Sequence, residues 1–200
     1  MSASHALRLP KCERRNQLLD AALLVVRNQG TEGLTLCSLA HQVGITHTVV
    51  YRHFDSRAGL LIALCEQADA HQVEVLQFSL ERAKRDLPGI ARAISEAYIN
   101  HALGAGKELH ALQAALNGNE AMTTVQRRLA ANHVAIWEHA LAPYSQLHPD
   151  QLHLRCIALL GAVSAVSGEL LRGGVELATA NSSLTALILG VAGPQRLTPV

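Results

Sequence analysis

The chain has 200 residues and a formal net charge of +1, with 49% apolar, 16% charged and only 3% aromatic residues. That apolar share excludes a disordered chain and is ample for a sizeable core. Because Leu and Ala are abundant and aromatic residues are rare, the composition favours helices over strands and predicts an all-α fold.

Charge is distributed unevenly along the chain. Residues 1–57 carry seven Lys and Arg against four Asp and Glu, a net of +3, whereas residues 58–200 carry ten against twelve, a net of −2. A basic N-terminal part fits a protein that binds a polyanion there, although random surface variation explains the same imbalance equally well.

Cysteine spacing and apolar runs argue against several classes of protein. The four cysteines are scattered with no CxxC pair, so no zinc or redox motif is visible. The N-terminus lacks the apolar region of a signal peptide. The longest apolar stretch, Cys156–Gly168, is shorter than the about 20 residues that span a bilayer. We therefore expect a cytoplasmic protein with no membrane contact, no metal and no cofactor.

A first helix is expected over about 13–28. Its apolar residues recur every three or four positions and form one stripe: Leu18, Ala22, Val25 and Val26. Gly30 follows as a residue suited to the left-handed conformation that ends a helix.

Two short helices and a long one are expected next. Thr35 stands where an N-cap belongs before the second helix, and Gly44 ends that helix. Thr46 is placed to cap a third helix. Asp55 or Ser56 is placed to cap a fourth, which extends to about residue 84.

The remainder of the chain has the apolar spacing of five more helices. Short segments rich in Gly and Pro separate them, as in a compact helical bundle. These helices are expected at residues 88–104, 107–117, 119–142, 149–172 and 182–192.

The segment from Thr35 to Arg57, TLCSLAHQVGITHTVVYRHFDSR, has the spacing of a helix-turn-helix. Two crossing helices need a small residue at their contact, which Ala40 supplies, and the tight turn needs a residue that tolerates positive φ, which Gly44 supplies. Val50 is the branched apolar residue that anchors the second helix to the core. The three positions together, between amphipathic helices, make a fairly specific pattern.

This segment resembles the DNA-binding domain of the TetR family of repressors. The likeness covers about residues 13–65: a first helix closed by a glycine, T-L-x-x-L-A at the start of the next, V-G-I-T through the turn, and Y-x-H-F-x-S-[KR]-x-x-L from Tyr51 to Leu60. The resemblance implies a helix-turn-helix DNA-binding domain over 1–57. It also implies a helical-bundle domain for effector binding and dimerisation over 58–200.

The resemblance places the third helix in the major groove, where each base pair presents its own donors and acceptors. Four residues are expected to point outward toward the DNA: Thr46, His47, Thr48 and Arg52. Among them, His47 and Arg52 are the candidates for reading bases. His47 stands at a position that is often Lys, Arg or Pro in the family.

Four more residues are expected to hold the DNA backbone: Thr35, Tyr51, His53 and Arg57. Tyr51 and His53 resemble phosphate contacts, which fix register rather than sequence preference, and Arg57 would add charge to the same backbone. Thr35 would bring the N-terminal amides of the second helix to a phosphate. Two plainer alternatives stay open: Thr35 as a helix cap only, and Tyr51 as a packing residue.

The last two expected helices, within about 149–192, have the character of an association surface. Gly161 and Ala165 recur at helical spacing among apolar residues, and a second apolar stripe runs from Leu184 to Val191. The resemblance implies a homodimer through these helices, which would read a pseudo-palindromic operator in double-stranded DNA. The alternative is that both stripes only close the core of a monomer.

The resemblance also implies a small-molecule effector site among the fourth to eighth helices. Six large residues on apolar segments are the candidates to line it: Tyr98, His101, Met122, His133, Trp137 and Leu141. An apolar cavity with a few polar anchors suits a small, largely apolar ligand. Plain core packing is the alternative for each residue taken alone.

The function expected from these features is a repressor that leaves its operator when the effector favours a dimer with wrongly spaced DNA-binding domains. An activator of the same fold is an open alternative. A metal-responsive regulator is another, because the chain has 11 histidines, although no HxxxH or HExxH pair occurs. No nucleophile elbow, Gly-rich phosphate loop or paired carboxylates indicate an enzyme.

Overall fold

Every regular element in residues 10–115 and 120–193, the part of the chain that the computed structural model describes, is a helix. In chain order these are α1 (Lys11–Gln29), α2 (Leu36–Val43), α3 (His47–Tyr51), α4 (Arg57–Arg82), α5 (Leu87–Ala115), α6 (Glu120–Leu141), the short 3-10 helix η2 (Ala142–Tyr144), α7 (Pro149–Leu171) and α8 (Leu177–Ala192). The expected all-α fold is confirmed.

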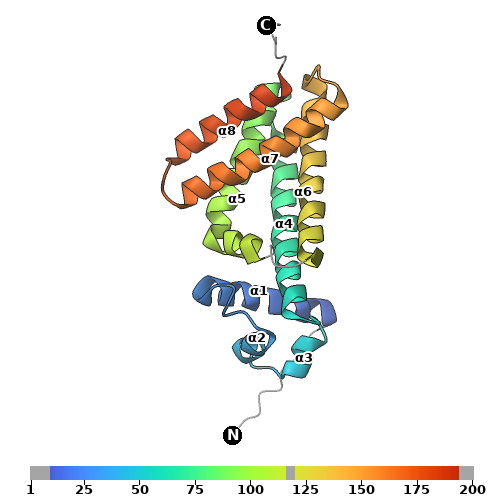
Figure 1. The fold of residues 1–200 in the computed structure, drawn as a ribbon, viewed down its shortest axis with the longest axis vertical. Helices are drawn as coiled ribbons and strands as arrows, with labels where there is room; N and C mark the ends of the chain where they lie inside the picture. The colour runs from blue at the N-terminus through green and yellow to red at the C-terminus, as the bar shows by residue number, and fades with distance from the viewer. Residues whose placement is uncertain (1–9, 116–119, 194–200) are drawn as a thin grey trace.

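The molecule is elongated, with α1, α2 and α3 forming a head at one end and the other helices forming a body (Figure 1). The long helix α4 runs from the head into the body, and α6 lies alongside it. At the far end, α7 and α8 pack against each other and against α5. Contacts between α5 and α1 make a second connection between head and body.

Two apolar cores lie one after the other along the length of the molecule. The head core joins α1, α2 and α3 to the first turns of α4, and it includes Leu112 of α5 and Met122 of α6. The body core surrounds the fully buried Trp137 and draws on α4 through α8. Since Leu60 to Cys65 belong to the head core, the head as a packing unit extends past residue 57, where we placed the end of the DNA-binding domain.

The helices of the head lie where their spacing predicts them. The expected stripe of α1 is buried, and Gly30 at its end has a φ of 73°. The next three helices begin after Thr35, Thr46 and Ser56. Periodic burial therefore sets the orientation of each helix. The hydroxyls of Thr35 and Ser56 cap α2 and α4, whereas Thr46 makes no side-chain cap hydrogen bond.

One expectation about the body is wrong. The break expected near Gly104 is absent, because α5 continues as a single helix from Leu87 to Ala115. Glycine in a helix interior is unfavourable by about 1 kcal/mol relative to alanine. Packing of α5 against α4, α7 and α8 outweighs that cost.

The other boundaries of the body differ by less. α8 begins at Leu177 rather than at residue 182, because Ala180 is buried and adds a turn to the apolar face. The ends expected at residues 117 and 119 lie outside the described residues. α6 and α7 end within one residue of the expected positions 142 and 172.

By length and composition alone, α7 is apolar enough to cross a membrane, with a mean hydropathy of 1.6 over 18 residues. The helix is longer than the apolar stretch Cys156–Gly168 noted in the sequence. It packs against α5, α6 and α8 through buried residues that include Cys156 and Leu159. The core helix of a soluble protein passes the same test, so this property does not distinguish the two cases.

Candidate functional site

The turn between α2 and α3 is built by the three residues that the spacing singles out. Ala40 is fully buried where α2 meets the head core, and its carbonyl oxygen accepts hydrogen bonds from the backbone N–H groups of Gly44 and Ile45. Gly44 has φ 69° and ψ 36°, the left-handed region that glycine occupies without steric cost. Val50 is fully buried and ties α3 to α1, α2 and α4 through the head core.

The outer face of α3 carries the predicted DNA-facing side chains. All of them are exposed: Thr46, His47, Thr48, Tyr51 and Arg52. The Tyr51 side chain is 52% exposed, so about half of its surface is open to solvent. The single buried residue of the helix, Val50, orients these side chains toward solvent.

At the N-terminus of α2, Thr35 forms a capping box with Ser38. The Thr35 hydroxyl accepts a hydrogen bond from the Ser38 backbone N–H at 2.9 Å, and the Ser38 hydroxyl accepts one from the Thr35 backbone N–H at 2.9 Å. The cap therefore satisfies two of the amides at this end of the helix. Thr35 has a structural task whether or not a phosphate approaches it.

Arg57 connects α4 to the loop between α1 and α2. Its guanidinium donates hydrogen bonds to the carbonyl oxygens of Thr31 at 2.6 Å and Leu34 at 2.9 Å. It also lies 3.3 Å from the Glu32 carboxylate, which is almost fully exposed. Most N–H donors of the Arg57 guanidinium are thus used within the head. The sequence pattern did not reveal this structural role, because the acceptors are backbone carbonyl groups.

His53 lies beside a group of cations on α1. The Arg15 guanidinium donates to the His53 carbonyl oxygen at 2.7 Å and stacks over the Phe54 ring, 4.6 Å from its centroid. Burial lowers the pKa of His53, and the neighbouring Lys11 and Arg15 lower it further. His53 is therefore a neutral hydrogen-bonding group at neutral pH. The positive charge beside it comes from α1, whose cationic side chains were not among the predicted DNA-binding residues.

Three of the predicted effector residues form one buried polar cluster in the body. His133 Nε2 lies 2.8 Å from the Asp69 carboxylate, and His133 Nδ1 is hydrogen-bonded to the Tyr98 hydroxyl. With Asp69 ionised, Nε2–H donates to the carboxylate and Nδ1 accepts from the tyrosine. Burial, reinforced by Asp69, holds the pKa of Tyr98 well above its usual value. The Tyr98 ring packs edge-on against Trp137, with centroids 5.0 Å apart.

Two other predicted effector residues are buried in separate cores. Met122 packs in the head core with Leu112, and Leu141 packs in the body core. Neither of them lines the cavity described next. Core packing thus accounts for both positions in this structure.

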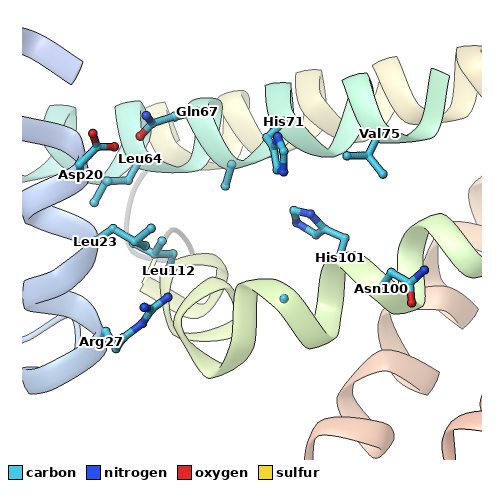
Figure 2. A pocket seen from close by; sticks show the side chains of 12 residues that line it. Asp20, Leu23, Arg27, Leu64, Gln67, His71, Val75, Asn100, His101 and Leu112 are labelled. Atoms are coloured by element: carbon cyan, nitrogen blue, oxygen red, sulfur yellow. The ribbon is translucent and has the colours of Figure 1, made fainter. Parts of the chain in front are cut away.

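A cavity of about 540 Å³ lies where the head meets the body, between α1, α4 and α5 (Figure 2). That volume is typical of small-molecule sites. Only His101 of the six predicted effector residues lines it. Its other walls come from residues that the sequence analysis did not single out, among them Leu23, Leu64, His71 and Leu112. No periodic signal marks them, because α1, α4 and α5 are brought together only by the tertiary fold.

The outer surface of α7 and α8 carries an exposed apolar stripe. On α7, Leu154 is 66% and Ile157 is 47% exposed, and Gly161 and Ala165 continue the stripe at helical spacing. On α8, Leu187 is 46% exposed. The two predicted stripes are therefore divided: part of each faces the monomer core, and part remains uncovered.

The rest of each stripe is buried within the chain. Leu159, Val163, Leu184 and Ile188 all lie in the body core. The alternative that the stripes close the core of a monomer is thus true for these residues. Among the described residues, no group of three or more His, Cys, Asp and Glu is placed to hold a metal ion.

An anchored α2–turn–α3 unit with an exposed polar outer face defines a helix-turn-helix protein, here joined to a helical body. Residues 18–64 match the family model described as bacterial regulatory proteins, tetR family. The match covers the head and the first turns of α4, so this part of the chain is similar to the DNA-binding region of the tetR family.

Three known proteins illustrate the relationship. The HTH-type transcriptional activator FasR of Mycolicibacterium smegmatis is 32% identical over 93 residues, which cover 46% of this chain and 42% of FasR. The chain thus spans less than half the length of that relative. The HTH-type transcriptional regulator BetI of Escherichia coli is 27% identical over 89% of this chain and 80% of BetI. A putative transcriptional regulator from Pseudomonas aeruginosa PAO1 shares the fold, with a TM-score of 0.79 at 14% identity over 94% of this chain and 95% of that one.

Proposed function

We propose that this protein is a homodimeric transcriptional repressor that binds a pseudo-palindromic operator and releases it when a small, largely apolar ligand binds. The observation that carries the proposal is the outer face of α3, where polar side chains stand exposed while Val50 holds the helix to the head core. The family match over residues 18–64 supports it independently. The site of action is the cytoplasm, where the DNA lies.

In this proposal α3 enters the major groove of double-stranded DNA. His47 and Arg52 read base edges, while the hydroxyl and methyl groups of Thr46 and Thr48 contact bases or phosphates. All four are exposed, with His47 and Thr48 within α3 and Thr46 and Arg52 at its two ends, and this arrangement supports these roles.

The DNA backbone is held beside this helix. Tyr51 and His53 donate hydrogen bonds to phosphates, and the Thr35 end of α2 faces a neighbouring phosphate. Arg57 adds positive charge, although its hydrogen bonds to Thr31 and Leu34 make it first a brace within the head.

Dimerisation through α7 and α8, within 149–192, is supported by their exposed apolar stripe. Apolar side chains as exposed as Leu154 and Leu187 gain free energy when a partner covers them. A two-fold axis at this stripe gives the dimer two identical heads, and their spacing determines whether both reach successive major grooves.

The experiment that tests the proposal is a fluorescence-polarisation titration of the protein against the DNA flanking its own gene, at two salt concentrations. A repressor of this kind binds one sequence saturably, and its affinity falls steeply with salt because phosphate contacts release counterions. Binding that is absent, or equal for scrambled DNA, would contradict the proposal.

An activator is the second candidate, because the similar protein FasR carries that name. The two candidates share the head and differ in what happens after DNA is bound. A reporter gene behind the identified operator separates them: deletion of the regulator raises expression for a repressor and lowers it for an activator.

A further inference from the structure

The cavity at the junction of head and body has an apolar part and a polar end. Leu23 of α1, Leu64 of α4 and Leu112 of α5 form the apolar part. In Figure 2, His71 of α4 and His101 of α5 face each other further along the cavity, away from α1. Asp20 and Arg27 of α1 and Gln67 of α4 also line the cavity near these leucines. A molecule that lies against the leucines and reaches the two histidines has an apolar part and a polar end.

The polar end contains an unsatisfied group. His101 Nε2 is buried and has no hydrogen-bond partner, although buried polar atoms in folded proteins are nearly always paired. Burial lowers the pKa of His101, with a further contribution from His71 and His133 that Asp69 opposes. A neutral imidazole here can donate an N–H hydrogen bond to an oxygen atom of a ligand. It can also take up a proton beside that oxygen atom.

The charges around the cavity determine which kind of oxygen fits best. Asp69 is paired with His133 and does not line the cavity. Two side chains of opposite charge, Asp20 and Arg27, line the cavity on α1, at the opposite end from the two histidines. A carboxylate placed between His71 and His101 thus lies away from the Asp20 carboxylate, and it can accept N–H hydrogen bonds from the imidazoles that are stronger than bonds to a neutral oxygen.

We propose that this cavity binds a small amphipathic carboxylic acid, with the carboxylate between His71 and His101 and the hydrocarbon chain against Leu23, Leu64 and Leu112. The cavity volume of about 540 Å³ accommodates a straight chain of eight carbons. The site predicts the chemical class of the effector. Only the expected effect of that effector on DNA binding rests on the proposed function.

The position of the site gives a direct route from ligand to DNA. Leu23 belongs to α1, which packs against α2 in the head, whereas His71 and His101 belong to the body. A ligand that touches both parts binds most tightly at one position of the head. It therefore shifts the head toward that position by its differential affinity, without a relay through the body core.

The chemical class is tested by calorimetric titration with three probes of equal chain length: octanoate, octanol and octylamine. We expect octanoate to bind about tenfold or more tightly than octanol, because a hydrogen bond to a charged group is worth more than one to a neutral group, and octylamine not to bind. Equal binding of octanoate and octanol, or preferential binding of octylamine, overturns the carboxylate assignment.

The location is tested with His101→Phe, which keeps a ring and removes its nitrogens. We expect octanoate affinity to fall about tenfold or more and octanol affinity to fall by less, because octanol loses only a neutral hydrogen bond. His139→Phe, at an exposed position on α6, is the matched control and should bind octanoate like the wild type. Unchanged octanoate binding by a folded His101→Phe protein overturns the site.

The route to DNA is tested by operator titrations with and without octanoate. We expect octanoate to change operator affinity by about fivefold or more. Leu23→Glu, which puts a charge in the apolar part, should abolish that change, whereas Leu24→Glu, an exposed neighbour that does not line the cavity, should preserve it. Octanoate that binds without altering operator affinity overturns the coupling. A protein that binds octanoate but never DNA refutes the proposed function and leaves the carboxylate site standing.

Discussion

Single residues of the head divide into those that face outward and those that hold the head together, and the division does not follow charge. Arg52 is exposed on α3, whereas Arg57 is bonded to two backbone carbonyls, and Arg15 stacks on Phe54. Two arginines five positions apart thus have different roles. Their substitution by alanine should separate DNA affinity from stability.

For Arg57→Ala, we expect the free energy of unfolding to fall by about 1.5–3 kcal/mol, because the carbonyls of Thr31 and Leu34 lose charged donors. Urea denaturation measures this change. Arg52→Ala should leave stability unchanged and weaken DNA binding. If both variants unfold at the same urea concentration as the wild type, Arg57 is not a brace.

For Tyr51→Ala, we expect DNA affinity to fall by roughly tenfold for every sequence alike, because a phosphate contact carries no sequence information. Substitution of His47 or Thr48 should instead change the preferred base at one position, with discrimination altered by about 1–3 kcal/mol. Titrations against a panel of single-base operator variants measure both effects. An unaltered operator affinity for Tyr51→Ala would falsify the phosphate assignment.

Among the elements, the turn between α2 and α3 depends most on one backbone conformation. Gly44 has φ 69°, and a side chain there is strained even though nothing within 4 Å would touch it. The position of α3 on the head follows from this turn and from burial of Val50.

For Gly44→Ala, we expect a loss of about 1–2 kcal/mol in the free energy of unfolding, the usual cost of the left-handed conformation for a residue with Cβ. Gly59→Ala is the matched control, because Gly59 is helical in α4 and its added Cβ meets only an ordinary contact with Ser56. That control should match or exceed the wild type in stability. Thermal unfolding of the two variants compares them, and equal melting temperatures would contradict the strain argument.

At the scale of the whole molecule, packing within a single chain leaves the apolar stripe on α7 and α8 exposed to solvent. Its exposed residues alternate with buried ones such as Leu159 and Val163, so the two helices have one face for the monomer and one for a partner. The heads lie at the other end of the molecule, so a dimer through this stripe leaves α3 free (Figure 1).

For the double substitution Leu154→Glu and Ile157→Glu, we expect a folded monomer, because two buried like charges on each side of a two-fold interface oppose association. Light scattering measures the mass, and operator affinity should fall together with dimerisation. Phe78→Glu, an equally exposed apolar position on α4, is the control and should remain dimeric. A wild-type protein that is monomeric at micromolar concentration would rule out the dimer.

The sequence by itself determined the helical class, the positions of α1 to α4 and the helix-turn-helix, because those features depend on local spacing. A buried stripe every three or four residues, a threonine or serine at a helix start and a glycine at a turn act within a few residues of themselves. Val50 was recognisable as a core residue for the same reason.

Only the tertiary structure decided where the cavity lies and which stripe residues stay exposed. The walls of the cavity come from residues such as Leu23, His71 and Leu112, which are far apart in sequence and share no period. Likewise, Tyr98 and His133 are buried together with Asp69, a partner 64 positions from His133, rather than placed around the cavity. Such neighbours are set by how helices pack across the molecule. The same packing keeps α5 helical at its glycines, where local helix propensity predicted a break.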